Sequence, residues 1–305
     1  MVARAVRGNI PAVVTPFAAN GDLRLDAFEA VLDWHLANGV DGICVAGDNG
    51  ESWALTKEER ARLCAAAVKR VAGRVPVIMG ASAITARDSI AYAALAAEAG
   101  ADAILLQPQA YVLKGSRGEI VRRYEAVAKA VSIPIVAYNS PRRTGIEMDV
   151  DTFGAVCDVA PVVAVKEASR DIFHVTKMHE RFADRVAILA GPAPFILPSI
   201  AMGARGFISS GPELFGREAA AIMGLGAAAP GPETRRMQFR LNAIYTALME
   251  TGTWPSALKH AHGLLGVDAG VPREPVLPLA PEQAAKIKSV MEAIGLIGPR
   301  ARAAE

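Results

Sequence analysis

The stretch AAEAGADAILLQ at residues 96–107 joins the end of an amphipathic run to a short apolar run. Gly100 stands where a helix should end, because glycine readily adopts the left-handed conformation that closes helices. The continuous apolar run that follows is typical of a parallel strand buried on both faces. The same arrangement recurs as ANGVDG at Ala37–Gly42, and a similar MGARG stands at Met202–Gly206. The repeat predicts a chain of alternating helices and strands.

Eight short runs rich in valine, isoleucine and alanine are expected to be strands. They are Ile10–Thr15, Gly42–Ala46, Val75–Met79, Ala103–Gln107, Ile133–Tyr138, Val162–Lys166, Val186–Ala190 and Gly206–Ser209. The spacing leaves room for one crossover helix between successive strands. Thr56, followed by Glu59, has the spacing of a capping box for one of these helices. Eight such units, with no GxGxxG after the first strand, predict an α/β fold of the (β/α)8 TIM-barrel type.

A Gly/Pro-rich break near Ala227–Pro232 divides the expected architecture. Residues 1–226 are expected to form the barrel, and residues 227–305 a C-terminal helical extension packed on it. Helices of the extension are expected near Glu233–Thr251, Pro255–Leu265 and Pro281–Ile294. Barrels of roughly 250 residues form one domain, so the length does not require two independent folds.

The composition and net charge limit the classes of partner that we expect. The chain is 52% hydrophobic and 21% charged with a formal net charge of +2, which gives no basis for a nucleic-acid or membrane partner. No apolar run approaches the roughly 20 residues that span a bilayer, and the N-terminus lacks a signal-peptide pattern. The sparse cysteines Cys44, Cys64 and Cys157 match no metal or disulfide pattern. We therefore expect a cytoplasmic protein.

Lys166 is the unusual residue of the strand pattern. It ends the apolar run Pro161–Val165, at the end of a barrel strand where active sites lie. Burial lowers the pKa of a lysine, and a neutral amine can form an imine with a carbonyl compound. Two other interpretations stay open, because the ammonium could reach the barrel mouth or pair with Glu167. Strand alternation weakens that pairing, since it places Glu167 on the opposite face.

Three further features at strand ends complete a candidate site. Tyr138 ends the neighbouring strand and could relay protons beside Lys166, or simply cover the core. In the next loop, Arg142 or Arg143 could bind a carboxylate, although a solvated arginine would have the same sequence. The turn Gly47–Ser52 could offer backbone N–H groups to a carboxylate, or be an ordinary loop.

In this order, the motifs resemble those of the dihydrodipicolinate synthase / N-acetylneuraminate lyase family, from about residue 8 to residue 300. They are Thr15–Phe17 (TPF), Gly47–Ser52 (GDNGES), Tyr138–Gly145 (YNSPRRTG), Lys166–Ala168 (KEA), Gly191 and Gly206–Ser209 (GFIS). The resemblance implies that Lys166 forms a Schiff base with pyruvate or a related 2-oxo acid, and that Tyr138 relays protons. It implies a class I carbon–carbon or carbon–oxygen lyase, without metal or added cofactor, built as a homotetramer of two tight dimers.

The resemblance also implies how substrates are held. The backbone of Asp48 and Asn49 would bind the pyruvate carboxylate, and Arg143 the distal part of the second substrate. The remaining pocket residues would be Gly191 and Ile208.

Two departures from the family pattern concern that second substrate. The two threonines that synthases carry in the turn are replaced by Asp48 and Asn49. The Pro-Tyr-Tyr segment after the fourth strand reads PQAY here, so the second catalytic phenol would be Tyr111, displaced by one position. We therefore expect retained imine chemistry with a more hydroxylated partner, such as a sugar-acid derivative. The alternative is the 4-hydroxy-tetrahydrodipicolinate synthase reaction of pyruvate with aspartate semialdehyde.

Three other functions remain as alternatives. A metal-dependent barrel aldolase needs ligands at strand ends, whereas all five histidines fall in expected helices. A phosphosugar enzyme could bind phosphate at Gly191 and Ser209–Gly211, after the seventh and eighth strands. A barrel that binds a 2-oxo acid without turning it over, as a sensor or partner module, is the third.

Overall fold

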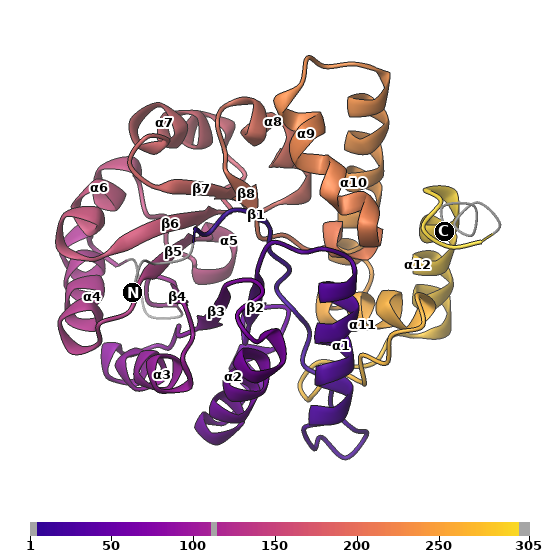
Figure 1. Ribbon diagram of the computed structural model, residues 1–305, viewed down its shortest axis with the longest axis horizontal. Helices are drawn as coiled ribbons and strands as arrows, with labels where there is room; N and C mark the ends of the chain where they lie inside the picture. The colour runs from indigo at the N-terminus through magenta and orange to yellow at the C-terminus, as the bar shows by residue number, and fades with distance from the viewer. Residues whose placement is uncertain (1–4, 111–114, 299–305) are drawn as a thin grey trace.

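The computed structural model describes residues 5–110 and 115–298, which form a barrel of eight parallel strands ringed by helices (Figure 1). The strands are β1 (Gly8–Asn9), β2 (Ile43–Val45), β3 (Val77–Gly80), β4 (Ala103–Leu106), β5 (Ile135–Asn139), β6 (Val162–Glu167), β7 (Ala187–Ala190) and β8 (Gly206–Phe207). They pair in the order β1-β8-β7-β6-β5-β4-β3-β2. The barrel closes where Ala12 forms a parallel bridge with Cys44. The predicted (β/α)8 barrel is therefore confirmed.

The first strand differs most from its expected bounds. Regular pairing covers Gly8–Asn9 rather than Ile10–Thr15, because Pro11 has no N–H to donate to a ladder. The segment that follows β1 still forms hydrogen bonds with both neighbouring strands. Ile10 donates its N–H to the carbonyl of Phe207 at 3.1 Å, and the carbonyl of Pro11 accepts from Cys44 at 2.9 Å.

Most helices of the barrel cover the outside of the strands, whereas the short helix at Pro141–Thr144 follows directly on the end of β5 (Figure 1). They are α1 (Leu25–Ala37), α2 (Lys57–Val71), α3 (Ala86–Ala99), α4 (Arg117–Ala130), α5 (Pro141–Thr144), α6 (Val150–Val159), α7 (Ile172–Phe182), α8 (Ile196–Ala201) and α9 (Ala221–Ala227), with short 3-10 turns η1 (Ser52–Ala54), η2 (Ala193–Phe195) and η3 (Pro212–Ala220). The capping box is present, because Thr56 Oγ1 accepts from the N–H of Glu59 and the Glu59 carboxylate accepts from Thr56. Within the described residues, every helix is too short or too polar to cross a membrane.

Three helices follow the barrel: α10 (Pro232–Glu250), α11 (Trp254–Leu264) and α12 (Pro281–Ala293). Leu241, Leu258 and Ile287 from these helices are fully buried in one hydrophobic cluster with Phe28 of α1. Burying apolar side chains in this way is the main term that holds packed elements together. The helices are close to the expected bounds and pack on the barrel, while the division near residue 227 stays a prediction.

A buried ion pair also ties α11 to the turn after β2. Lys259 Nζ lies 2.5 Å from Glu51 Oε1, with side chains 2% and 0% exposed. The other carboxylate oxygen accepts from the N–H of Arg273 at 2.9 Å. Burial lowers the pKa of Lys259 to about 8, and the charge of Glu51 opposes that shift. Glu51 has a φ of 53°, a left-handed conformation that costs most residues about 1–2 kcal/mol. The pair therefore helps to hold a strained turn.

We expect Glu51→Gln to lower the free energy of unfolding by about 3–5 kcal/mol, because the buried amine of Lys259 would lose its counter-ion. The double variant Glu51→Gln/Lys259→Met should recover much of this loss, since the buried amine and its missing counter-ion are then both replaced by uncharged side chains. Urea unfolding measures both. As a control, Glu125→Gln in the exposed Glu125–Lys129 pair should leave the midpoint nearly unchanged. A double variant as unstable as the single one would contradict the charge argument.

Candidate active site

The pairing of β5 and β6 places Lys166 beside Tyr138 at the C-terminal end of the barrel. Tyr138 is the register partner of Lys166. The Lys166 Nζ atom lies 4.2 Å from the centre of the Tyr138 ring. Both side chains are buried, with residue exposures of 7% for Lys166 and 4% for Tyr138. The geometry therefore gives an amine and a phenol in contact, away from bulk water.

The surroundings of Lys166 favour its neutral form. Burial lowers its pKa, and the negative charge of Asp48 opposes that shift. Glu167 faces the other way. It accepts from Asn139 Nδ2 at 3.0 Å and lies 3.2 Å from His174 Nε2. No ion pair joins Lys166 to Glu167 in residues 5–110 and 115–298, as strand alternation predicted.

Asp48 links the phenol to a cation. The Tyr138 hydroxyl donates to Asp48 Oδ2 at 3.0 Å, and Arg143 Nε lies 3.7 Å from the same oxygen. Burial raises the pKa of Tyr138 well above its usual value, and the negative charge of Asp48 raises it further. The phenol therefore keeps its proton at neutral pH and points it at a carboxylate.

Side chains from three regions fix the turn that carries Asp48. Thr15 Oγ1 donates to the carbonyl of Gly50 at 2.8 Å. Asn49 Oδ1 accepts from Ser210 Oγ at 2.9 Å and from Trp254 Nε1 at 3.1 Å. With its side-chain oxygen engaged, Asn49 can contribute its backbone to a ligand.

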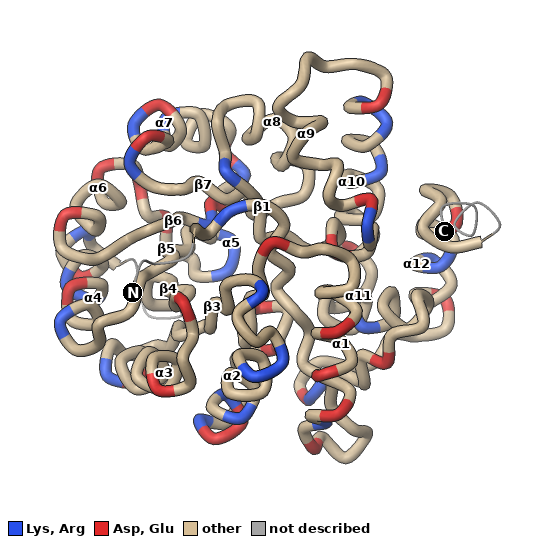
Figure 2. The backbone as a smooth tube through the Cα atoms, viewed as in Figure 1, with Lys and Arg blue, Asp and Glu red and all other residues tan. Residues whose placement is uncertain are grey.

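Most of these groups line one cavity of about 50 Å³. Of the predicted site residues, it brings together Asp48, Asn49, Tyr138, Arg143, Lys166, Gly191 and Ile208. A side chain at Gly191 would not fit, because its Cβ would lie 2.5 Å from that of Ala168. Arg142 also lines the cavity. Figure 2 shows the two arginines of α5 as a basic segment beside the strand ends. The predicted phenol Tyr111 lies outside the described residues.

Several residues in or near the site were missed by the sequence analysis. Tyr245 and Met249 reach the cavity from α10, where apolar and aromatic spacing indicates only core packing. Glu213, in η3, is buried at 3% exposure. Burial raises its pKa to about 8, although nearby backbone amides and the charge of Lys166 oppose that shift. A single glutamate after the last strand carries no motif that could have revealed this.

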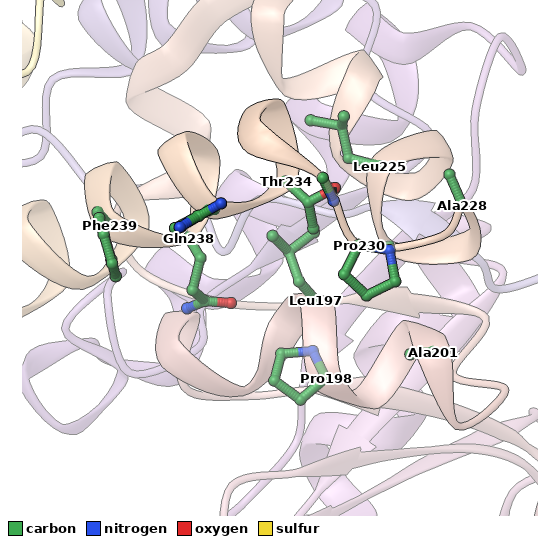
Figure 3. A pocket seen from close by; sticks show the side chains of 12 residues that line it. Leu197, Pro198, Ala201, Leu225, Ala228, Pro230, Thr234, Gln238 and Phe239 are labelled. Atoms are coloured by element: carbon green, nitrogen blue, oxygen red, sulfur yellow. Dashed lines mark hydrogen bonds between the residues drawn. The ribbon is translucent and has the colours of Figure 1, made fainter.

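Other parts of the molecule are poorer candidates for the active site. A cavity of about 470 Å³ lies where Leu197 and Pro198 of α8 face Thr234 and Gln238 of α10, and none of the predicted site residues lines it (Figure 3). The five histidines lie in α1, α7 and α11, as predicted. In the part of the chain that the structure describes, no group of three histidine, cysteine or carboxylate side chains could hold a metal ion.

Comparisons with known proteins agree with this geometry. The model of the dihydrodipicolinate synthetase family matches residues 5–294. A 4-hydroxy-tetrahydrodipicolinate synthase of Pelobacter propionicus is 33% identical over 292 residues, covering 95% of this chain and 99% of that protein.

Solved structures of the family are also similar to this chain in fold. Dihydrodipicolinate synthase from Aquifex aeolicus has a TM-score of 0.89 at 30% identity, covering 95% of this chain and 99% of that one. A prophage protein of the dihydrodipicolinic acid synthase family from E. coli K12, solved in complex with pyruvate, has a TM-score of 0.89 at 26% identity, with 95% and 99% covered. From the family match along nearly its whole length, this chain belongs to the dihydrodipicolinate synthetase family.

Proposed function

We propose that the protein is a Schiff-base lyase or synthase that acts on pyruvate or a related 2-oxo acid. The observation that carries this proposal is the buried amine of Lys166, 4.2 Å from the ring of Tyr138, at the end of the barrel where catalytic groups gather. The pyruvate complex of the E. coli relative supports the choice of 2-oxo acid.

In this mechanism, the neutral amine of Lys166 adds to the keto carbon of pyruvate. Loss of one water from the carbinolamine gives an iminium, and loss of a methyl proton gives an enamine. The enamine carbon attacks the carbonyl of a second substrate, and hydrolysis returns the water and frees the lysine. Cleavage runs the same steps in reverse. Tyr138 would carry protons to and from the carbinolamine oxygen, with Asp48 orienting its hydroxyl.

For the other residues we propose the roles that the family resemblance implies. The backbone of Asp48 and Asn49 would bind the pyruvate carboxylate, and Arg143 the distal part of the second substrate. Gly191 and Ile208 would shape the pocket. Tyr111 as a second phenol, the homotetramer, the lack of an added cofactor and the cytoplasmic location stay predictions.

For the second substrate we propose a hydroxylated acid, such as a sugar-acid derivative. Asp48 replaces a neutral threonine of the synthases, and a carboxylate accepts hydrogen bonds from substrate hydroxyls. The name of the Pelobacter relative supports the alternative, aspartate semialdehyde. Two assays decide between them: condensation of pyruvate with aspartate semialdehyde, and cleavage of sugar-derived 2-oxo acids to pyruvate. Full turnover of aspartate semialdehyde, with none of sugar-derived 2-oxo acids, would refute the hydroxylated partner.

Borohydride reduction in the presence of pyruvate should leave a reduced pyruvyl adduct on Lys166, because the iminium is the reducible species. Peptide mass spectrometry locates the adduct. Lys166→Met should abolish it, whereas Lys129→Met, at an exposed lysine of α4, should not. An unmodified wild-type protein, with pyruvate and larger 2-oxo acids in millimolar excess, would refute the Schiff-base mechanism.

Asp48→Asn should move the acid limb of imine formation to lower pH. The charge of Asp48 raises the pKa of Lys166, so its removal lowers that pKa further and leaves more neutral amine in acid. Asparagine still offers Tyr138 an acceptor. Initial rates of cyanoborohydride trapping across pH measure the shift. Asp88→Asn, at an exposed carboxylate beside Thr85, is the matched control. An alkaline shift, or none, would contradict this electrostatic role.

A further inference from the structure

Trp254, the first residue of α11, reaches from the C-terminal helices into the turn after β2. Its Nε1 donates to Asn49 Oδ1 at 3.1 Å. Trp53 meets it edge to face, with ring centroids 5.6 Å apart and planes inclined by 66°. The indole is therefore held in a fixed orientation, by a hydrogen bond on one side and a second aromatic ring on another.

The guanidinium of Arg143 stacks on the face of this indole. The guanidinium carbon lies 3.5 Å from the centre of the Trp254 ring, a close cation–π contact. Stacking occupies the flat face of a guanidinium and leaves the N–H groups at its edge for a planar anion. In the described residues, the Arg143 side chain donates no hydrogen bond, and its nearest acidic oxygen is Asp48 Oδ2, at 3.7 Å from Nε. The donors of Arg143 are thus oriented but unused.

Arg143 also stands between two cavities. With Asp48, it lines both the cavity of about 50 Å³ at Lys166 and a larger one of about 590 Å³. Trp254 lines only the larger cavity. A second substrate whose carbonyl reaches the Lys166 enamine would therefore extend its distal end past the guanidinium.

We propose that Trp254 is a positioning residue that presents Arg143 to an anionic group at the distal end of the second substrate. It thereby makes the pyruvate-loaded site prefer aldehydes that bear a carboxylate over neutral aldehydes of the same length. A free arginine side chain loses rotamer freedom when it binds, and the stack removes part of that cost in advance. This inference rests on the proposed function, because it requires the Lys166 enamine.

The test uses two four-carbon probes, 4-oxobutanoate and butanal, which differ in the distal carboxylate. Each is measured as an inhibitor of the exchange of pyruvate methyl protons with deuterium, a partial reaction that needs only the enamine. The readout is the ratio of the two inhibition constants within each variant. In the wild type we expect a preference of about tenfold or more for the anion, as for a charge-assisted hydrogen bond.

Trp254→Ala should lower this preference by about threefold to tenfold, the range of a cation–π contact. Trp254→Phe should keep most of it, because a phenyl ring still stacks under the guanidinium. Arg143→Ala should abolish the preference, and Trp254→Ala should have no further effect in that background. Phe239→Ala, at an exposed aromatic of α10, is the control and should leave the ratio unchanged.

The outcomes separate this inference from the proposed function. Absence of pyruvate exchange in the wild type would refute the Schiff-base function itself. Exchange with an anion preference that survives Trp254→Ala would overturn only the positioning role. An equal loss on Trp254→Ala with and without Arg143 would also overturn it, because Trp254 would then act independently of the guanidinium.

Discussion

Keeping the amine of Lys166 out of water is the constraint around which the site is arranged. An ammonium in an apolar barrel is costly, so burial shifts the residue toward its neutral form. The parallel register then decides its neighbour, because Tyr138 on β5 lies opposite Lys166 on β6. The ring face of Tyr138 offers weak stabilisation to a positive charge at the same nitrogen. Such a contact suits a group that, in the proposed mechanism, becomes cationic as an imine forms.

Asp48 acts on three charged or titratable groups at this site. It accepts from the phenol of Tyr138, and its charge raises the pKa of both Tyr138 and Lys166. It also lies beside Arg143. A threonine at this position could accept the hydrogen bond but could not supply the charge. The departure from the family turn thus changes the electrostatics of the site more than its hydrogen-bond pattern.

The sequence predicts those parts of the molecule that local patterns determine. Apolar runs located the strands, and alternation along β6 correctly separated Lys166 from Glu167, whose partners are Asn139 and His174. Pro11 shortens the hydrogen-bonded ladder of β1, and this effect could be recognised only from the positions of both neighbouring strands. Trp254 and Asn49 are 205 residues apart, and no sequence motif contains both of them. Contacts of that kind arise from packing the extension on the barrel, which no local pattern encodes.

The C-terminal helices are consequently part of the site as well as its support. α11 contacts the turn after β2 twice, through the buried Lys259–Glu51 pair and through the bond from Trp254 to Asn49. One short turn thus has three roles. Asp48 provides a carboxylate at the candidate active site, Asn49 contacts the extension, and Glu51 carries a buried charge. Because a buried ion pair tolerates little displacement, α11 cannot shift without moving this turn. If Trp254 presents Arg143 to the second substrate as proposed, the orientation of Arg143 depends on how tightly the extension docks, and the same few contacts couple stability to recognition.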